Sequence, residues 1–517
     1  METLVQLAQD AADRWPGRVF LHFDETGEAL TFDVFDRRTD AIAAALTSHG
    51  VGKGDRVLVA SGNDALFPLA WFGILKAGAI MAPLNINYTL DEARHVVALA
   101  QPKAAICDAP RAPLIAALAK EFALSPCIAP RARGKGWLSF EEVSRPDTLE
   151  RSRVGVASTP DDLTNLQFTS GTSGLPKACM LTHRYWNVLA TAVREAVIDL
   201  DSDDVILTAQ AFSYLDPQWM LVLAMSTGAR LVVLDRFRPS RLWDKIVEHD
   251  ASFFYCLAAM PLMLLSSAPG PSERKHRLRV VMCSAIPADR HSELERRFHV
   301  PWVEAYGSTE TGSDLGVLAE DRMIALGSGS IGKPLAHREA MIVDDALRPL
   351  PDDAAGELLV RGRGMMSGYW RDPEATAAAF HEGWYRTGDI ARRDVRGFYH
   401  LVGRRKDMIR RGGENIAAAE VEAAIHQHPA VVVAACVATP DPVRNEEVRA
   451  FVVRCEAVTA HELVEFLKPR LARFKIPRYW SFVPALPMTP SERVAKPLLP
   501  RELDANTIDV ARPASEP

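Results

Sequence analysis

The stretch NLQFTSGTSGLPKACMLTH, from Asn165 to His183, joins two apolar segments through six small residues, and Lys177 follows them. Glycine lets the backbone approach a ligand closely and adopt positive φ, and serine and threonine add hydroxyl donors. A concave set of such N–H and O–H donors suits phosphate oxygens, and a lysine beside it adds a positive charge. We therefore predict a phosphate-binding loop next to Lys177 that is made of Thr169, Ser170, Gly171, Thr172, Ser173 and Gly174.

The plain alternative for this run is a flexible Ser/Thr/Gly linker. Two neighbours favour a built loop: the preceding LQF is typical of a buried strand end, and Pro176 stiffens the exit. The loop is not a P-loop, because the spacing G-x-x-x-x-G-K-[ST] is absent. It is not a dinucleotide fingerprint either, because no G-x-G-x-x-G opens a helix here.

The composition bounds the class of protein. A chain of 517 residues suggests two to four domains or subdomains, and 48% apolar residues allow a sizeable core. The net charge of -6 and the pI near 6.2 argue against nucleic acid as the main partner. The seven cysteines are scattered without a C-x-x-C pair, so neither a zinc site nor a disulfide framework is indicated. This pattern fits a reducing cytoplasm.

The N-terminus, METLVQLAQDAADRWPGR, carries acidic residues early and lacks an apolar core segment, so we do not interpret it as a signal peptide. The most apolar run, ALFPLAWFGILKAGAIMAPL, is interrupted by Pro68, Lys76 and glycines. We predict that it forms a buried helix followed by a strand, and no membrane span.

The order of the segments predicts an α/β fold. Strand patterns such as DRVLVASG alternate with helix patterns such as DVFDRRTDAIAAALTSHG, which favours parallel sheets covered by helices. From about residue 325 short alternating strands indicate a small barrel, and a mixed helix and strand segment of roughly 110 residues ends the chain. The last residues, DANTIDVARPASEP, are typical of a disordered tail.

A second stretch, EAYGSTETG, combines an aromatic ring, a hydroxyl and a carboxylate between Glu304 and Gly312. Tyr306 could stack on a base, and Thr309 could bond a phosphate. Glu310 could hold Mg²⁺, which prefers carboxylate and phosphate oxygens. Taken alone, the stretch is equally well explained as a turn with an exposed acid.

Three later segments add charged candidates. GWYRTGD ends in Asp389, a carboxylate suited to two ribose hydroxyls, and GRRKDMIRRGGENI offers Arg404 as a ribose or phosphate contact. PMTPSERVAKPLL carries Arg493 and Lys496. Singly, these have plain alternatives: TGD is a common loop tripeptide, the arginine-rich segment could be a solvated face, and Lys496 could be a surface charge.

Taken in this order, the segments resemble the adenylate-forming superfamily of acyl-CoA synthetases, luciferases and peptide-synthetase adenylation domains. The resemblance covers about residues 10 to 500 and looks most similar to bacterial medium-chain and carnitine/crotonobetaine-type CoA ligases. It implies an ATP-dependent ligase in which a carboxylate attacks the α-phosphorus to give acyl-AMP and pyrophosphate, and a thiol then displaces AMP. The implied cofactors and co-substrates are ATP, Mg²⁺ and coenzyme A.

The resemblance also implies an α/β architecture in two parts. We expect residues 1–404 to form a large N-terminal domain of stacked α/β subdomains with a small β-barrel. Residues 405–505 would form a small mobile α+β domain, and residues 506–517 a disordered tail. Lys406 occupies the hinge position about which the small domain is thought to swing, and Gly412, Gly413 and Glu414 would lie on its second face.

Residue roles follow from the same resemblance. Lys177 and the loop from Thr169 to Gly174 would hold the β- and γ-phosphates, Thr309 would meet the α-phosphate, and Glu310 would bind the metal. Catalysis is therefore assigned to Lys177, Thr309, Glu310, Arg493 and Lys496. Nucleotide binding beyond the loop is assigned to Ser284 and Ala285 of CSAIP, Tyr306, Gly307, Asp389 and Arg404.

The chain departs from the family at its last motif. Where the family has Pro-Thr-x-Gly-Lys, this sequence has Thr489-Pro490-Ser491-Glu492-Arg493, with Lys496 three residues on. Arginine keeps the charge, but it is planar and wider than lysine. Three readings stay open: Arg493 replaces the lysine, Lys496 reaches in, or ordinary carboxylates are adenylated weakly.

This departure keeps two other hypotheses open. One is an adenylate-forming enzyme with a non-thiol acceptor, such as an amide synthetase or a diazotase that joins nitrite to an aryl amine. The other is a non-catalytic nucleotide-binding or regulatory protein. This hypothesis is disfavoured because the candidate residues for magnesium (Glu310) and ribose (Asp389 and Arg404) are all present.

The acid pocket is expected within AFSYLDPQWMLVLAM, where the family places a gate beside the acyl site. The candidates are Phe212, Ser213, Tyr214 and Trp219, and core packing is the alternative for the rings. If these residues line the pocket, a short or aromatic acid fits better than a long fatty chain. A homodimer is a further hypothesis.

Overall fold

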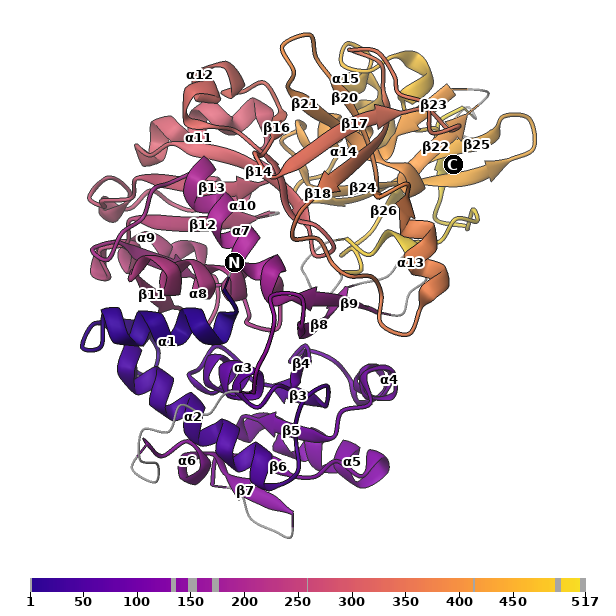
Figure 1. The fold of residues 1–517 in the computed structure, drawn as a ribbon. Coiled ribbons are helices and arrows are strands. Elements are labelled where there is room, and N and C mark those ends of the chain that lie inside the picture. Colours follow the sequence, from indigo (N-terminus) through magenta and orange to yellow (C-terminus); the bar gives the residue numbers. More distant parts are fainter. Residues whose placement is uncertain are drawn as a thin grey trace. The chain divides into compact units, whose positions relative to one another are not determined.

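The structure, a computed structural model, describes residues 2–131, 136–146, 156–169, 176–257, 259–411, 414–488 and 494–511 (Figure 1). The chain divides into two compact units. The first comprises Met1–Glu339 and Arg361–Gly383, and the second comprises Ala340–Val360 and Trp384–Pro517.

The first sheet of the first unit follows the predicted strand and helix alternation. Among the described residues its order is β7 (Trp137–Ser139), β6 (Cys127–Ala129), β5 (Ala104–Cys107), β3 (Arg56–Ala60), β4 (Ile80–Pro83), β8 (Leu163–Thr169) and β9 (Lys177–Thr182). Neighbours are parallel up to β8, and β9 returns antiparallel to β8. This last pair is the hairpin that carries the predicted phosphate loop.

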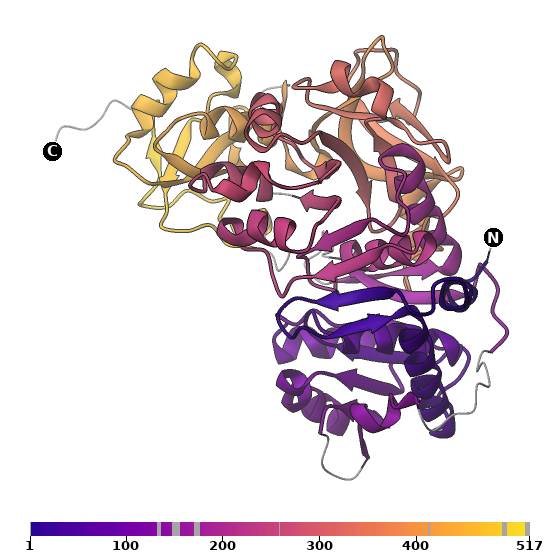
Figure 2. The same ribbon diagram turned by 90° about the vertical axis from the view of Figure 1, so that its left-hand side faces the viewer.

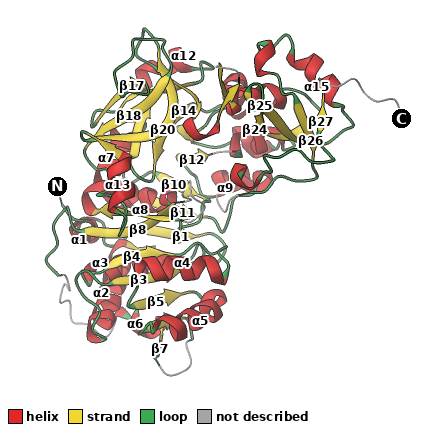
Figure 3. Ribbon diagram, turned by 90° about the vertical axis from the view of Figure 1, so that its right-hand side faces the viewer, coloured by secondary structure: helices red, strands yellow, loops and turns green. Residues whose placement is uncertain are grey.

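Helices cover both faces of this sheet. Figure 3 shows α2 (Phe32–Ser48) on one side of β3 and β5, and α4 (Leu90–Ala100) and α5 (Ala112–Phe122) on the other. A short α6 (Phe140–Val143) follows β7. The capping box between Thr89 and Glu92 explains where α4 begins, because both side chains satisfy backbone N–H groups of the first turn.

The apolar run near residue 70 forms α3 (Leu66–Lys76) and then β4, as the sequence predicts. Every residue of α3 is buried. Lys76, at its end, is fully buried too, and its ammonium lies 2.5 Å from Asp36 and 2.7 Å from Asp40. Paired in this way, a charge can sit inside the core. Among the described residues, no helix combines the length and the apolar character needed to cross a bilayer.

The second sheet of the first unit joins distant segments. Its strands in this unit are β2 (Ala29–Thr31), β1 (Val19–Phe23), β11 (Arg230–Val233), β10 (Val205–Thr208), β12 (Phe253–Leu257), β13 (Val280–Ser284), β14 (Trp302–Ser308), β15 (Gly312–Gly316) and β16 (Ser330–Pro334). Figure 2 shows the indigo strands β1 and β2 beside the magenta strands, and Leu21 pairs with Leu231. From β1 to β14 the neighbours are parallel, and β15 and β16 turn back antiparallel.

The helices of this region are α1 (Leu4–Arg14), α7 (His183–Ala196), α8 (Leu215–Thr227), α9 (Pro239–Glu248), α10 (Met260–Ser266), α11 (His291–Phe298), α12 (Arg322–Ala325) and α13 (Pro373–Ala379), with a two-residue strand β19 (Phe380–His381). A buried apolar cluster joins β10, β12 and β13 to α9 and α11. It fixes the carboxyl ends of β12, β13 and β14, where ligands bind in open α/β sheets.

The second unit holds two groups of strands. Where the sequence predicts a small barrel, β17 (Arg338–Val343), β18 (Gly356–Gly362), β20 (Trp384–Arg393) and β21 (Tyr399–Arg404) follow one another. The other group is β23 (Glu414–Ala417), β22 (Met408–Arg411), β25 (Asn445–Arg454), β26 (Tyr479–Phe482) and β27 (Ile508–Asp509), with β24 (Val431–Asp441) paired to β25, and it includes a parallel pair, β25 with β26. The helices α14 (Ala418–His426) and α15 (Ala460–Leu467) share an apolar core with it.

The predicted disordered tail, 506–517, is corrected over its first residues. Ile508 pairs with Trp480 of β26, and Asp509 lies 2.9 Å from Arg478. Strand pairing with the buried Trp480 and an ion pair with Arg478 thus hold Ile508 and Asp509 in place, although the composition of this segment is typical of disorder. Residues 512–517 lie outside the described residues.

Candidate active site

The β8–β9 hairpin places two predicted residues directly opposite each other. Thr169, the last residue of β8, and Lys177, the first of β9, are register partners. The predicted loop residues Ser170, Gly171, Thr172, Ser173 and Gly174 lie outside the described residues. The antiparallel pairing therefore sets the first residue of the predicted loop beside the lysine that follows the loop.

Tyr369 connects Lys177 to Glu310, although neither sequence motif contains it. The Tyr369 hydroxyl donates to Oε1 of Glu310 at 3.1 Å. The Lys177 ammonium lies 4.9 Å from the centroid of the same ring. A cation over a tyrosine face and an ionised acceptor at its hydroxyl are both favourable contacts. The predicted phosphate lysine and the predicted metal carboxylate thus meet at one side chain.

Backbone pairing explains why Tyr369 lies there. The N–H of Met180 donates to the carbonyl of Gly368 at 2.9 Å, and that of Trp370 donates to Ala178 at 2.8 Å. The segment around Tyr369 therefore extends the β9 edge. The N–H of Met366 donates to the backbone carbonyl of Glu310 at 2.8 Å, which ties the same segment to the second stretch.

A buried thiol lies beneath these groups. Cys179 of β9 is fully buried, and its backbone forms an isolated antiparallel β-bridge with that of Tyr369. Burial, and then the nearby carboxylate of Glu310, hold the pKa of the Cys179 thiol well above its usual range. The thiol is therefore neutral, and it adds no negative charge to the site.

Buried hydrogen bonds and an ion pair hold the turn that carries Thr309 and Glu310. Tyr185 of α7 donates its hydroxyl to the carbonyl of Thr309 at 3.0 Å. Thr311 donates to Asp314, and Arg338 pairs with Asp314 at 2.7 Å with both side chains almost fully buried. This ion pair fixes the turn because breaking it would leave an unpaired charge in the core.

Gly307 is required by the close approach of two backbone strands. A Cβ at Gly307 would lie 1.8 Å from the carbonyl oxygen of Gly312, a distance that no side chain can tolerate. Tyr306, immediately before it, is half-buried at the end of β14. Gly307 thus lets β15 pair closely with β14 next to Tyr306, the candidate contact for adenine.

The segment CSAIP lies at the carboxyl end of β13, and Glu304 holds its backbone. Both oxygens of this buried carboxylate accept N–H groups, from Ala285 at 2.6 Å and from Ile286 at 2.7 Å. Ala285 has φ of 75°, which L residues seldom adopt. Burial raises the pKa of Glu304 to about 8 against the opposing effect of the two N–H donors. Ser284 accepts or donates a hydrogen bond with the Tyr255 hydroxyl at 2.9 Å.

The four candidates for the acid pocket differ in exposure. Phe212 is fully buried and stacks on Phe67 at 5.3 Å, and Trp219 is 3% exposed with its ring against Tyr255. These contacts are those of core side chains. Tyr214 is half-buried, and its hydroxyl accepts a hydrogen bond from Asn85 at 2.9 Å.

Ser213 differs from the rings beside it. Its hydroxyl is buried and finds no hydrogen-bond partner among the described residues. Its backbone carbonyl accepts from Gln167 of β8 at 2.8 Å, and Gln218 donates to the carbonyls on either side, those of Phe212 and Tyr214. The backbone is thus held firmly, while the Ser213 hydroxyl has no partner among the residues that the structure describes.

In the second unit, the predicted ribose residues meet each other. Asp389 of β20 and Arg404 of β21 are register partners, and the carboxylate lies 2.5 Å from the Arg404 guanidinium. Asp389 is 4% exposed, whereas the Arg404 side chain is half exposed. Antiparallel pairing accounts for this contact between residues from separate motifs.

Of the remaining predicted residues of the second unit, the structure describes the side chains of Lys406 and Lys496. Lys406 is exposed in the 3₁₀ turn Arg405–Asp407. Lys496 is mostly buried, 2.7 Å from Glu422 of α14 and 3.9 Å from Asp407. Arg493, Gly412 and Gly413, with Thr489 to Glu492, lie outside the described residues, and the Glu414 side chain is likewise outside them.

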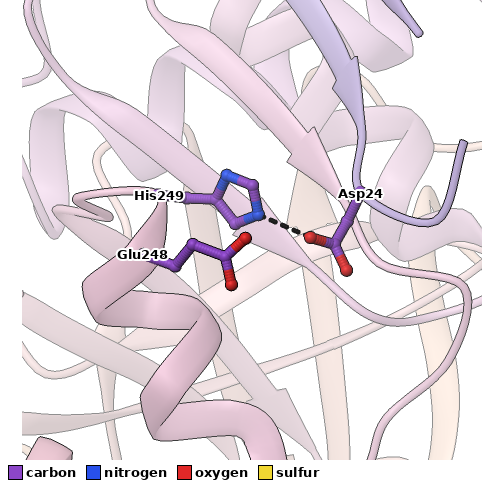
Figure 4. A group of neighbouring side chains, drawn as sticks. All are labelled: Asp24, Glu248 and His249. Carbon is purple, nitrogen blue, oxygen red and sulfur yellow. Dashed lines mark hydrogen bonds and ion pairs between the residues drawn. The ribbon is translucent and has the colours of Figure 1, made fainter. Parts of the chain in front are cut away.

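A group that could hold a metal lies elsewhere in the first unit. Asp24, Glu248 and His249 converge in Figure 4, with His249 2.7 Å from Asp24. The Lys245 ammonium, however, lies 2.8 Å from both Asp24 and Glu248. The ammonium of Lys245 already pairs with both carboxylates, so we interpret the group as an ion-pair cluster that ties α9 to the end of β1.

Comparisons with known proteins agree with this architecture. The sequence model of AMP-binding enzymes matches residues 8–370, and that of the AMP-binding enzyme C-terminal domain matches residues 420–493. The feruloyl-CoA synthase of Amycolatopsis sp. is 32% identical over 481 residues, 91% of this chain and 93% of that protein. The crotonobetaine/carnitine–CoA ligase of Proteus mirabilis (strain HI4320) is 29% identical over 518 residues, 95% and 98% of the two chains. The ATP-bound structure of MatB from Rhodopseudomonas palustris has a TM-score of 0.85 at 26% identity, over 96% and 98% of the chains.

The two α/β sheets and the likeness to ATP-bound MatB are those of an adenylate-forming enzyme. The chain belongs to the AMP-binding enzyme family, as the match over residues 8–370 shows. It is an AMP-forming ligase that uses ATP and Mg²⁺ to activate a small carboxylic acid as an acyl-adenylate and then transfers the acyl group to coenzyme A. The resemblance inferred from the motifs is thereby confirmed.

Proposed function

We propose that Lys177, Thr309, Glu310 and the loop from Thr169 to Gly174 bind the triphosphate during acid activation. The observation that carries this proposal is the junction at Tyr369, which brings a cation of the first motif and a carboxylate of the second together. Phosphoryl chemistry between two anions needs charge neutralisation and alignment more than covalent help. Glu310 would hold Mg²⁺, which supplies positive charge to phosphate oxygens when bound.

The rest of the nucleotide is assigned by motif and local geometry. Ser284, Ala285, Tyr306 and Gly307 would border adenine, and the Glu304 carboxylate supports this because it fixes two of the adjoining backbone N–H groups. Asp389 and Arg404 would hold the ribose hydroxyls. Their ion pair supports a shared role, because it orients the Asp389 carboxylate, and an oriented carboxylate is a strong acceptor of hydrogen bonds from hydroxyl groups.

For the altered last motif, we favour Arg493 as the cation that bridges the acid and the α-phosphate. The ion pairs of Lys496 with Glu422 and Asp407 support this choice, because they already satisfy that ammonium. Lys406 remains the proposed hinge, with a mobile domain from 405 to 505. In this proposal the first domain spans residues 1–404.

We propose a short or aromatic acid as the substrate. Feruloyl-CoA synthase and crotonobetaine/carnitine–CoA ligase, by their names, act on an aromatic acid and on short acids. The large rings of Phe212 and Trp219 fill space near Ser213 and Tyr214, which disfavours a long fatty chain. A preference for fatty acids of roughly twelve carbons or more, the scale of a pocket-sized ligand, would refute this class.

We also propose a cytoplasmic location and a homodimer. All seven cysteines are free and six of them are buried, which suits a reducing compartment. Light scattering of the purified chain tests the dimer, and a monomer at all concentrations would refute it.

One experiment tests the proposed function. The full chain is incubated with ATP, Mg²⁺ and a panel of acids, and coenzyme A, an amine or nitrite is added separately before the product is identified by mass. We expect AMP release that depends on coenzyme A, and we expect Glu310→Gln to abolish it. Release that depends on an amine or nitrite instead would favour the non-thiol acceptor. No AMP under any condition would favour the non-catalytic nucleotide-binding protein.

A further inference from the structure

Three contacts single out Tyr369 among the side chains around the candidate site. Its hydroxyl donates to Glu310, its ring face receives Lys177, and its backbone N–H donates to Thr376 Oγ1 at 2.9 Å. The residue is 9% exposed, so it is packed in place. The position of this ring is therefore set by its surroundings before any ligand binds.

The two charges beside Tyr369 would otherwise attract each other. A lysine and a glutamate within a few ångströms gain Coulomb energy by forming an ion pair, and the gain is larger where water is excluded. Among the described residues it is the Tyr369 ring that connects Lys177 and Glu310, and no direct ion pair joins them. A direct pair would neutralise both groups and withdraw them from phosphate and metal.

The hydroxyl and the ring face have separate effects. The hydroxyl occupies one lone pair of Glu310 Oε1 and so fixes the direction of the carboxylate. The ring face attracts the ammonium of Lys177 without cancelling its charge, because the interaction is with a quadrupole. One residue can therefore orient both an anion and a cation.

We propose that Tyr369 is a positioning residue, which holds the Glu310 carboxylate toward Mg²⁺ and the Lys177 ammonium toward phosphate and keeps the two from pairing. This inference rests on the proposed function, since it assigns Tyr369 to the same triphosphate and metal site. Tyr369 itself contacts Glu310 and Lys177, and it need not contact the nucleotide.

The test is calorimetric titration of the full chain with ATP, in excess Mg²⁺ and in EDTA, so no acid is needed. The ratio of the two dissociation constants measures the gain in ATP affinity that Mg²⁺ gives. In Tyr369→Phe, which keeps the ring, we expect this ratio to fall about tenfold, the size of a lost hydrogen bond to a charged group. ATP affinity in EDTA should remain unchanged.

Tyr369→Leu removes the ring face as well. We expect the same loss of the Mg²⁺ effect and, in addition, about threefold weaker ATP binding in EDTA, because Lys177 loses its cation–π contact. Tyr399→Phe is the matched control: this buried tyrosine of β21 donates to the carbonyl of Ala340, and its loss should leave both dissociation constants unchanged. Circular dichroism establishes that each variant is folded, and Tyr369→Phe decides alone if Tyr369→Leu does not fold.

The outcomes separate this inference from the proposed function. An unchanged ratio in Tyr369→Phe, beside a Glu310→Gln variant that loses the Mg²⁺ effect, overturns the role of Tyr369 and leaves Glu310 as the metal residue. Equal weakening of ATP binding in Mg²⁺ and EDTA also overturns it, because that is what a merely structural residue would give. A Glu310→Gln variant that keeps the Mg²⁺ effect refutes the assignment of Glu310 itself.

Discussion

Lys496 and Glu422 form an ion pair 2.7 Å long, in which the carboxylate also accepts the backbone N–H of Cys436 at 2.5 Å. The Lys496 side chain is 18% exposed and that of Glu422 is 14% exposed. Burial raises the pKa of Glu422, and the neighbouring ammonium of Lys496 opposes this. The pair thus links the turn after the altered last motif to helix α14.

Lys496→Met should destabilise the protein because it leaves the Glu422 carboxylate buried without its cation. We expect a loss of about 3 kcal/mol in the free energy of unfolding, measured by chemical denaturation. The double variant Lys496→Met/Glu422→Gln should recover most of it, since both charges are then absent. A single variant as stable as the native chain would show that the pair is unimportant for folding.

The same double variant decides between Lys496 and Arg493 in the reaction. If Arg493 bridges the acid and the α-phosphate, the double variant should release pyrophosphate at close to the native rate. Arg493→Ala should slow acyl-adenylate formation more than it slows thioester formation from supplied acyl-AMP. A stable double variant without adenylation would instead assign the step to Lys496.

Gly307→Ala should collapse the turn that carries the candidate catalytic residues. The added Cβ would lie 1.8 Å from the Gly312 carbonyl oxygen, and backbone atoms must move to relieve it. We expect a loss of about 3 kcal/mol in stability and at least a hundredfold loss of AMP release. Gly17→Ala is the control, because nothing lies within 4 Å of its added Cβ. Native activity in Gly307→Ala would contradict the requirement for glycine.

Local patterns in the sequence were sufficient for some of this site. Thr169 and Lys177 flank a short loop between two apolar strands, so their pairing follows from a hairpin. Tyr369 could not be predicted, because its place depends on backbone pairing with β9, far away in the chain. The available signal was a Gly-Tyr-Trp run between a strand and a helix, and such a run has many structural uses.

The partners of single charged residues were equally hidden. Nothing in the sequence joins Lys496 to Glu422, since a helix and a distant turn must pack before their charges meet. Phe212 and Trp219 show a second limit of prediction from sequence. An aromatic residue suits a core as well as a pocket, and only the packing in the folded chain distinguishes the two. The chemistry of motifs is thus readable from sequence, whereas their supporting contacts require the fold.

Glu304 should make stability depend on pH in a defined direction. Its pKa is about 8 in the fold, against an ordinary value of 4.5, so between these values the folded chain binds one more proton than the unfolded chain. The free energy of unfolding should therefore fall as pH rises through this window, by up to about 1.4 kcal/mol per pH unit from this group. Below the window the contribution is fully present, and above pH 8 it is lost.

Glu304→Gln isolates this contribution, because an amide does not titrate. Chemical denaturation of both proteins across the window should show the variant gaining stability relative to the native chain as pH rises. Glu339→Gln serves as the control, since this exposed acid pairs with Arg361 at the surface and should give a flat difference. A flat difference for Glu304→Gln as well would mean that the buried carboxylate does not hold a proton.

Ser213→Ala asks whether the Ser213 hydroxyl serves the acid rather than the fold. Because the buried Ser213 hydroxyl has no partner among the described residues, its removal should leave stability unchanged or raise it by up to about 1 kcal/mol. If the hydroxyl bonds the acid, the KM for the acid should rise about fivefold while the KM for ATP stays constant. Ser226→Ala is the matched control on α8, where the hydroxyl donates to the Leu223 carbonyl at 2.9 Å. That control should change neither KM, and an unchanged KM for the acid in Ser213→Ala would place the acid pocket away from Ser213.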